Sequence, residues 1–257
     1  MSSVKTIPAV PLISVRNLQK KFEDQVILQN VSIDLRVGDF IALVGPNGCG
    51  KSTILNIISG LTGVGHPCSP VVMNLPSNQV SYLFQNPRGL LLPWRTGFAN
   101  LSFPLEIQGV PAPEIRARIH GLAGLFRFDE LDKFPYQLSG GQLQKLAFIR
   151  ALINFPKVLL IDEPFSAVDY GNSLVLRGML QDYFLKNDLT VLIVTHNIEE
   201  AVHLANKIVI LSDKPSEVVE IIDNPAPYPR PIGFLGSLEF HQLKERVLSA
   251  FQREAGI

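Results

Sequence analysis

The residues best suited to chemistry in this sequence form a glycine-rich stretch that ends in a lysine and two hydroxyl residues. Residues 45–53 read GPNGCGKST and match the spacing G-x-x-x-x-G-K-[ST]. Glycines let backbone N–H groups converge on phosphate oxygens, and the N-terminus of a following helix adds partial positive charge. The pattern predicts a phosphate-binding loop made of Gly45, Pro46, Asn47, Gly48, Cys49, Gly50, Lys51, Ser52 and Thr53.

Three side chains of this loop have individual interpretations. Lys51 would place a point charge near the terminal phosphates of a nucleotide, and Ser52 can bind Mg²⁺. The alternative is a glycine-rich turn with a solvated lysine, which the apolar strand before it and the helix after it disfavour. Cys49 is interpreted as a small filler, and a redox sensor is the alternative.

A second set of candidate chemical groups follows an apolar run near the middle of the chain. The segment KVLLIDEP at 157–164 reads as a buried strand that ends in Asp162 and Glu163. Asp162 at the carboxyl end of a strand suits a magnesium ligand, and Glu163 could polarise an attacking water. The alternative is a surface acidic pair that ends the strand.

The stretch QLSGGQLQKLAFIRAL indicates a second helix start able to bind an anion. Ser139 is a candidate N-cap, Gly140 and Gly141 leave the backbone open, and Gln142 begins the helix. One chain seldom needs two such sites for one nucleotide. We therefore expect this helix end to cover a nucleotide held by a second copy, with an ordinary capped helix as the alternative.

The surrounding elements predict how these groups are positioned. Buried apolar strands alternate with helical patterns at 39–61 and again from 157 to 213, which indicates a parallel sheet with helices on its faces. Residues 71–85 read as two strands about a Pro-Ser-Asn turn. The helical texture of the middle segment, broken by Pro and Gly, indicates an inserted helical part.

The predicted organisation is a single nucleotide-binding domain of 257 residues. Its expected parts are an ATP-binding core at 1–85 and 156–235, a helical subdomain at 86–155 and a C-terminal helix at 236–257. The expected fold class is α/β, a P-loop NTPase with a RecA-like, mostly parallel sheet, an antiparallel β subdomain and the helical insertion.

Composition limits the other classes of function. Lys and Arg together number 23, as do Asp and Glu, so no global field attracts nucleic acid. The longest apolar runs are far shorter than a membrane span, and the N-terminus lacks the apolar region of a signal peptide. Cys49 and Cys68 form no disulfide framework. Any association with a membrane is expected to require a partner.

The LSGGQ stretch at 138–142, between the two halves of the phosphate site, resembles the signature motif of ABC-type ATPases. The resemblance covers nearly the whole chain. It implies a head-to-tail dimer, of identical chains or close paralogues, that holds two ATP molecules with Mg²⁺. Each ATP would lie between the phosphate loop of one copy and residues Ser139, Gly140, Gly141 and Gln142 of the other.

The same resemblance assigns four further positions. Gln85 matches the glutamine that reaches Mg²⁺ and the attacking water, and His196 matches the histidine that contacts the γ-phosphate. Asp169 in SAVD would lie at the dimer seam, and Phe22 would stack on adenine. Two departures occur away from the chemical residues: LQK follows the signature where the family often has an RQR-like run, and 63–78 lacks a familiar hairpin turn.

The stretch LLPWRT, residues 91–96, resembles the ATPase subunits of nitrate, sulfonate, taurine and bicarbonate importers. In this family the region receives a helix of the membrane subunit, and exposed apolar residues suit such an interface. We expect Pro93 and Trp94 to contact that partner. The exposure of Leu90, Leu91 and Leu92 stays open, with a mixture of buried and exposed leucines expected.

These observations and the resemblance predict an ATP-hydrolysing subunit of an importer for a small solute, in which Glu163, His196, Gln85 and Lys51 carry the catalysis. The resemblance favours an anion such as nitrate, a sulfonate, taurine or bicarbonate as that solute. The expected partners are integral-membrane permease subunits and, indirectly, an extracytoplasmic solute-binding protein, at the cytoplasmic face of the membrane. No nucleic acid is expected. The alternatives are an importer ATPase for an unrelated solute and a soluble ABC ATPase acting on nucleic acid or ribosomes. A P-loop kinase or GTPase and an inactive regulatory cassette are disfavoured.

Overall fold

The computed structural model of the protein describes residues 10–63 and 71–255. Residues 1–9, where a signal peptide was sought, lie outside the described residues. So do Cys68 and the rest of 64–70, which belong to the segment that lacks the familiar turn. Within the described part of the chain, no helix is both long and apolar enough to cross a bilayer.

The larger of two sheets has six strands in the order β5-β6-β7-β3-β8-β9. Neighbouring strands are parallel except at the edge, where β9 runs antiparallel to β8. Every residue of the central strands β3, β6 and β7 is buried, which explains their apolar sequences. The strands are β3 (Phe40–Val44), β5 (Val80–Leu83), β6 (Val158–Asp162), β7 (Thr190–Val194), β8 (Lys207–Leu211) and β9 (Val218–Asp223).

The smaller sheet is antiparallel and has the order β2-β1-β4. Its strands are β1 (Ile13–Phe22), β2 (Gln25–Leu35) and β4 (Val71–Met73). Apolar residues of β1 and β2 form a continuous core with helix α1 (Lys51–Ile58) and with one face of the larger sheet, represented by Ile41 and Leu43. This core supports the loop between β3 and α1 from below.

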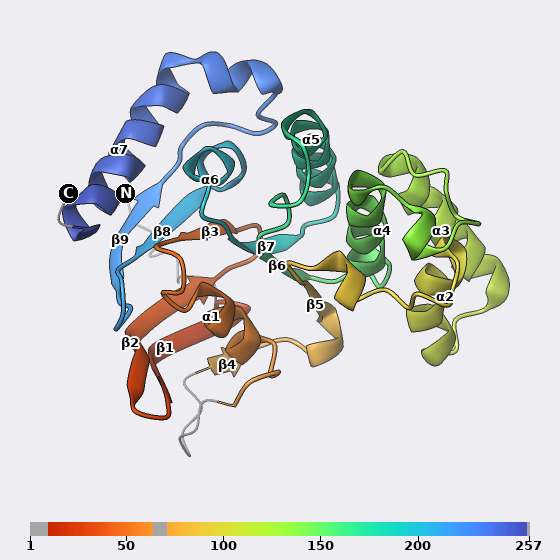
Figure 1. Cartoon of the computed structure of the whole chain (residues 1–257), viewed down its shortest axis with the longest axis horizontal. Helices are drawn as coiled ribbons and strands as arrows, with labels where there is room; N and C mark the ends of the chain where they lie inside the picture. The colour runs from red at the N-terminus through yellow and green to blue at the C-terminus, as the bar shows by residue number, and fades with distance from the viewer. Residues whose placement is uncertain (1–9, 64–70, 256–257) are drawn as a thin grey trace, which may run out of the picture.

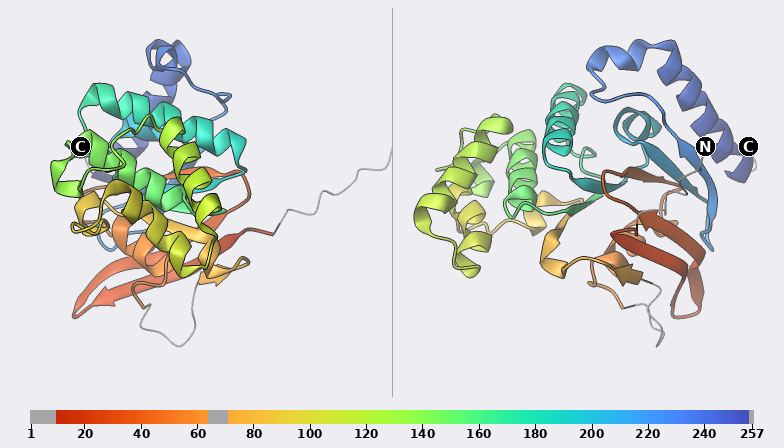
Figure 2. Two further views of the ribbon diagram at one scale, coloured as in Figure 1. Left: turned by 90° about the vertical axis from the view of Figure 1, so that its right-hand side faces the viewer. Right: turned by 180° about the vertical axis from the view of Figure 1, so that it is seen from behind.

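The helices cover the larger sheet and extend beyond its β5 edge. Helices α5, α6 and α7 cover one face, while α1 and the small sheet cover the other (Figure 1). Helices α2, α3 and α4 group together beyond β5 and β6 (Figure 1), as the view from behind also shows (Figure 2, right). Their bounds are α2 (Gly97–Ile107), α3 (Ala112–Leu125), α4 (Gly140–Leu152), α5 (Tyr170–Lys186), α6 (Ile198–Leu204) and α7 (Leu238–Ala255). Short 3-10 helices are η1 (Ser77–Gln79), η2 (Pro87–Gly89), η3 (Pro135–Gln137) and η4 (Ile232–Gly236).

The structure confirms the predicted alternation of strands and helices and the two strands about the Pro-Ser-Asn turn, and it adds one strand that was not predicted. Strands β4 and β5 do flank the Pro-Ser-Asn turn, but they belong to different sheets, so the segment links the two layers. The antiparallel strand β9 was not predicted. It pairs with one neighbour at the edge, and its burial pattern is mixed, so it lacks the apolar run of a central strand.

Candidate functional site

The predicted phosphate-binding loop lies between β3 and α1, at the carboxyl edge of the parallel sheet. Gly50 has a φ of 110° at the N-cap of α1. A Cβ atom at this position would lie 2.7 Å from Cδ2 of Leu28, closer than side-chain contacts allow. Gly50 is therefore required by both its backbone conformation and the close approach of β2.

Cys49 is buried within this loop. Its carbonyl accepts a hydrogen bond from the hydroxyl of Ser216, which ties the loop to the segment after β8. The thiol belongs to the core formed by α1 and the small sheet. Because reactive thiols need access to solvent, this burial supports the role of small filler over that of a redox sensor.

Lys51 folds back over the loop that precedes it. Its ammonium donates to the carbonyl of Gly45 at 2.9 Å and to the carbonyl of Pro46 at 2.8 Å, and the residue is 5% exposed. Ser52 next to it is exposed at the start of α1, and Thr53 is partly buried. The loop thus gathers one cation, a hydroxyl and a helix N-terminus within a few residues, as phosphate binding requires.

Asp162 ends β6 as a buried carboxylate. Its Oδ1 has no hydrogen-bond partner within the described chain, and the hydroxyl of Tyr82 lies 3.5 Å from its Oδ2. Burial raises the pKa of Asp162, and Ser52, Tyr82 and Lys51 oppose that shift. A buried unpartnered carboxylate oxygen beside a serine hydroxyl fits a hard divalent cation. The described residues contain no cluster of three or more His, Cys, Asp or Glu side chains that could hold a metal ion.

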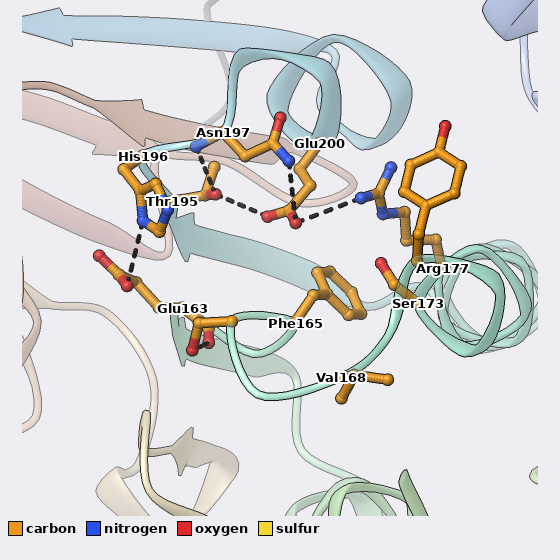
Figure 3. Close-up of a pocket in the computed structure, with 11 residues that line it drawn as sticks. Glu163, Phe165, Val168, Ser173, Arg177, Thr195, His196, Asn197 and Glu200 are labelled. Atoms are coloured by element: carbon orange, nitrogen blue, oxygen red, sulfur yellow. Dashed lines mark hydrogen bonds and ion pairs between the residues drawn. The ribbon is translucent and has the colours of Figure 1, made fainter. Parts of the chain in front are cut away.

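Glu163, Gln85 and His196 converge at the same edge. The side-chain amide of Gln85 donates a hydrogen bond to Oε2 of Glu163 at 3.1 Å, and Nδ1 of His196 lies 3.2 Å from that same oxygen. Figure 3 shows the imidazole of His196 facing the Glu163 carboxylate. Glu163 has a φ of 41°, a left-handed conformation that non-glycine residues rarely adopt. Such strain clusters at functional sites.

Phe22 ends β1, and its ring is exposed. The ammonium of Lys20 lies 4.9 Å from the ring centroid, within the range of a cation–π contact. An exposed aromatic face on this strand is available for stacking on a planar ligand.

The signature residues form a capped helix start that is apart from the phosphate loop. The backbone N–H of Gln142 donates a hydrogen bond to the Ser139 hydroxyl at 3.4 Å. The backbone N–H of Ser139 donates in return to Oε1 of the Gln142 side chain at 2.9 Å. A Cβ at Gly140 would lie 3.5 Å from the carbonyl of Ala167, whose segment, 166–169, follows Glu163. The signature helix end therefore neighbours the SAVD segment of its own chain.

Asp169 in that segment caps helix α5. Its Oδ1 accepts from the amide of Asn172 at 3.0 Å, and its other oxygen accepts from the Asn172 side chain at 2.7 Å. These hydrogen bonds, led by the one from the backbone, lower the pKa of Asp169. The residue is exposed, so the cap also lies open to contact with another molecule.

The apolar loop before α2 has one well exposed ring. Trp94 is 71% exposed and Pro93 is exposed, whereas Leu91 is 3% exposed and packs in the core. Leu90 and Leu92 are half-buried, so the expected mixture of leucine environments is present.

Two residues that hold this loop were missed by the sequence analysis. Asn100 is fully buried in α2, accepts from the amide of Leu92 at 2.8 Å and donates to the carbonyls of Leu92, Arg95 and Thr96. Arg150 of α4 donates to the carbonyl of Leu90. An Asn among the apolar residues at the start of α2 was the available signal, because an amide side chain on a buried helix face must be hydrogen-bonded.

A phosphate loop lies between a buried strand and a helix, and an acidic pair ends another parallel strand of the same sheet, one strand removed. This arrangement defines a P-loop nucleotide-binding protein. Residues 28–166 match the family described as ABC transporter. This match spans the phosphate loop, Gln85, the signature and the acidic pair. The chain belongs to the ABC transporter family of ATP-binding proteins.

Similar proteins agree with this assignment. The aliphatic sulfonates import ATP-binding protein SsuB of Bacillus cereus is 34% identical over 251 residues, covering 94% of this chain and 96% of that protein. The spermidine/putrescine import ATP-binding protein PotA of Thermotoga maritima is 38% identical over 216 residues, covering 81% of this chain and 58% of that protein.

Solved structures share the fold. The ATP-binding cassette MJ0796, in a dimeric post-hydrolysis state bound to ADP and Pi, has a TM-score of 0.72 and 27% identity. The likeness covers 84% of this chain and 100% of that one. The predicted fold class is thus confirmed, and the chain is an ATP-binding ABC-type ATPase whose hydrolysis is coupled to transport.

Proposed function

We propose that this chain hydrolyses ATP to drive an importer of a small organic or inorganic anion, with an alkanesulfonate as the first candidate solute. The observation that carries the catalytic part is the convergence of Gln85 and His196 on Oε2 of Glu163, at 3.1 and 3.2 Å. The alignment with SsuB supports the solute, because it spans 96% of that protein, whereas the alignment with PotA spans 58% of its length. Nitrate, taurine and bicarbonate are the other anions to compare.

In the proposed site each residue has one role. The backbone of 45–50 and the ammonium of Lys51 bind the phosphates, and Phe22 stacks on adenine. Ser52, Asp162 and Gln85 would hold Mg²⁺, which when bound offsets the negative charge of the phosphates. Asp162 supports this assignment because its buried Oδ1 lacks a partner within the described residues.

Glu163 acts as the base in hydrolysis. Its carboxylate accepts a proton from a water whose oxygen attacks the γ-phosphorus, while the bond from that phosphorus to the bridging oxygen breaks and ADP leaves. His196 contacts the γ-phosphate, and Lys51 stabilises the charge that develops on it. Gln85 donates to Glu163 and so orients the carboxylate toward the water.

A second copy completes each site. Ser139, Gly140, Gly141 and Gln142 of one copy would cover the nucleotide held by the other, with Asp169 at the seam. The exposure of Ser139, Gly140 and Asp169 supports this arrangement. In a head-to-tail dimer, both phosphate-binding helix starts of each chain would contact a nucleotide.

The helical part transmits this closure to the membrane. We assign the ATP-binding core to 1–85 and 156–235, the helical subdomain to 86–155 and the C-terminal helix to 236–257. Pro93 and Trp94 contact a permease subunit, which holds the chain at the cytoplasmic face of the membrane and receives the solute from an extracytoplasmic binding protein. The exposed Trp94 ring supports this, because such rings dominate the energetics of protein interfaces.

The solute is tested with the permease and the solute-binding protein that assemble with this chain. The binding protein is titrated with an alkanesulfonate, taurine, nitrate, bicarbonate and spermidine by calorimetry, and the full complex is assayed for ATP-driven uptake in liposomes. Sulfonate binding and uptake support the proposal. Binding of spermidine alone, or uptake without ATP hydrolysis, would overturn it.

A further inference from the structure

The loop that carries His196 is tied down by residues on either side of the histidine. This loop, residues 195–197, joins β7 to α6. The Thr195 hydroxyl donates to Oε2 of Glu200 at 2.6 Å, and the Asn197 amide group donates to Oε1 of Glu200 at 3.4 Å. The backbone N–H of Asn197 donates to the Thr195 hydroxyl at 3.0 Å. One carboxylate therefore binds both flanks of His196.

His196 itself has little else to hold it. Its side chain is 52% exposed, and its ring faces Glu163. A cavity of about 240 Å³ opens beside it, lined by Glu163, His196, Arg177 and Glu200 among others (Figure 3). Because this space contains no packed side chains, the hydrogen bonds of its loop, rather than close packing, determine where the imidazole lies.

Glu200 is in turn anchored from a different helix. Arg177 of α5 is 1% exposed and donates from one guanidinium nitrogen to Oε1 of Glu200 at 3.2 Å. Its other nitrogen donates to Glu199 at 3.3 Å, and its guanidinium carbon lies 5.5 Å from the ring centroid of Phe165. Phe165 is two residues after Glu163. The Arg177–Glu200 pair thus joins α5, α6 and the segment that carries the proposed base.

The burial of the Glu200 carboxylate favours a single geometry of the 195–197 loop. Burial raises the pKa of Glu200, and the contacts with Thr195 and Arg177 oppose that shift. A buried carboxylate that loses its partners is costly, so the loop and α5 are held where they satisfy it. The result is one defined geometry for 195–197 instead of an ensemble.

We propose that Glu200, anchored by Arg177, is a positioning residue that fixes the 195–197 loop and thereby keeps His196 at hydrogen-bonding distance from Glu163. Glu200 touches no reacting atom and acts through His196. The inference rests on the proposed role of His196 in hydrolysis, and it adds the residues that set the position of that histidine.

The first test compares Glu200→Gln with Glu199→Gln in the full chain. Glutamine keeps the volume of glutamate but cannot accept hydrogen bonds from Thr195, Asn197 and Arg177 as a carboxylate does.

A displacement of about 1 Å at a catalytic group can cost about 100-fold in rate. We expect Glu200→Gln to lower kcat for ATP by about 10- to 100-fold with KM within about threefold. We expect Glu199→Gln, on the same helix, to keep the parental kcat because the hydrogen bonds of the Glu199 side chain go to Arg177 and Tyr170 of α5. A Glu200→Gln kcat within twofold of the parent would overturn the proposal.

A double-mutant cycle separates positioning from general destabilisation. In a His196→Ala background, Glu200→Gln should cause no further loss of kcat, because the residue through which it acts is gone. A structural defect would lower kcat equally in both backgrounds, and that outcome counts against the proposal. Thr195→Val is expected to behave like Glu200→Gln, and Thr195→Ser, which keeps the hydroxyl, to restore the rate.

A readout without catalysis distinguishes this proposal from the proposed function. Amide hydrogen exchange over 195–199 should be faster in Glu200→Gln than in the parent while the exchange of β7 is unchanged. Unchanged exchange over 195–199 contradicts the positioning role whatever the rates show. A parental kcat in His196→Ala alone would instead overturn the assignment of His196 in the proposed function.

Discussion

Nδ1 of His196 lies 3.2 Å from Oε2 of Glu163, and that same oxygen accepts a hydrogen bond from Gln85. The three residues follow β7, β6 and β5, which are adjacent parallel strands. Because parallel strands end at one edge, residues that are 111 positions apart in the sequence, from Gln85 to His196, reach a single carboxylate. The sheet itself thus assembles the proposed catalytic group.

The phosphate loop depends on Gly50 for its shape. A left-handed residue with a Cβ costs about 1–2 kcal/mol in strain, and here the Cβ would also meet Leu28 at 2.7 Å. We expect Gly50→Ala to weaken ATP binding at least about tenfold, which corresponds to about 1.4 kcal/mol. Equilibrium binding of a fluorescent ATP analogue measures this change.

Gly60→Ala is the matched control for this substitution. Gly60 also has a positive φ, of 77°, but an added Cβ there would have no atom within 4 Å. It should reduce thermal stability through backbone strain and leave ATP binding unchanged. Equal binding by the two variants would show that the close packing around Gly50 does not shape the site.

Trp94 is predicted to contribute to assembly and not to catalysis. Trp94→Ala should leave the ATPase rate of the isolated chain within twofold of the parent. It should weaken binding to detergent-solubilised permease by about 30-fold, as expected for a central interface residue worth about 2 kcal/mol. Leu238→Ala on α7, where another apolar residue is exposed, serves as the control. Unchanged permease binding by Trp94→Ala would rule out the interface.

Stability should fall in mild acid because of His203. This residue is buried, its Nε2 donates to the carbonyl of Arg230 at 2.9 Å, and its Nδ1 has no hydrogen-bond partner within the described chain. Burial lowers the pKa of His203, and the charges of Arg177 and Arg230 add to this, while the hydrogen bond to the Arg230 carbonyl and the charge of Glu199 oppose it. The unfolded chain, with a histidine pKa of about 6.5, therefore binds a proton that the native state does not.

The stability from neutral His203 is therefore present above about pH 6.5 and is lost as the pH falls toward the folded pKa. We expect the free energy of unfolding of the parent to decrease from about pH 7.5 to about pH 5.5. His203→Gln, which keeps a donor for the Arg230 carbonyl, should show a smaller decrease. Denaturant unfolding at both pH values measures this, and identical decreases in the two proteins would contradict the role of His203.

The features that could be predicted from the sequence are local ones. The phosphate loop is read from glycine spacing between an apolar strand and a helix, and Asp162 and Glu163 are read from their place at the end of a buried run. Strand β9 could not be predicted because it pairs at one edge only, with a mixed burial pattern. Glu200 could be read as the partner of a helix cap at Asn197, but its pairing with Arg177 was missed because that pairing joins two helices that the sequence does not place side by side.

The loop before α2 also combines features that can be read from the local sequence with contacts that only the fold creates. Its apolar residues and Trp94 were recognisable as unusual, but their separate environments depend on Asn100, which hydrogen-bonds the loop from within α2. The hydrogen bonds between Asn100 and the backbone of Leu92 form only when the loop folds over the helix, so they cannot be read from the sequence. Composition alone therefore indicated an interface without showing which of its residues stay exposed.

The central claim is that Glu163 activates the water that attacks ATP, and the turnover of Glu163→Gln tests it most directly. Phosphate release by the purified chain is measured with saturating ATP and Mg²⁺, beside the parent and an exposed-carboxylate control, Glu245→Gln on α7. We predict a loss of at least about 100-fold in kcat for Glu163→Gln, with ATP affinity within about threefold and an ATP-bound dimer that persists on gel filtration. Turnover at the parental rate by Glu163→Gln would contradict the account.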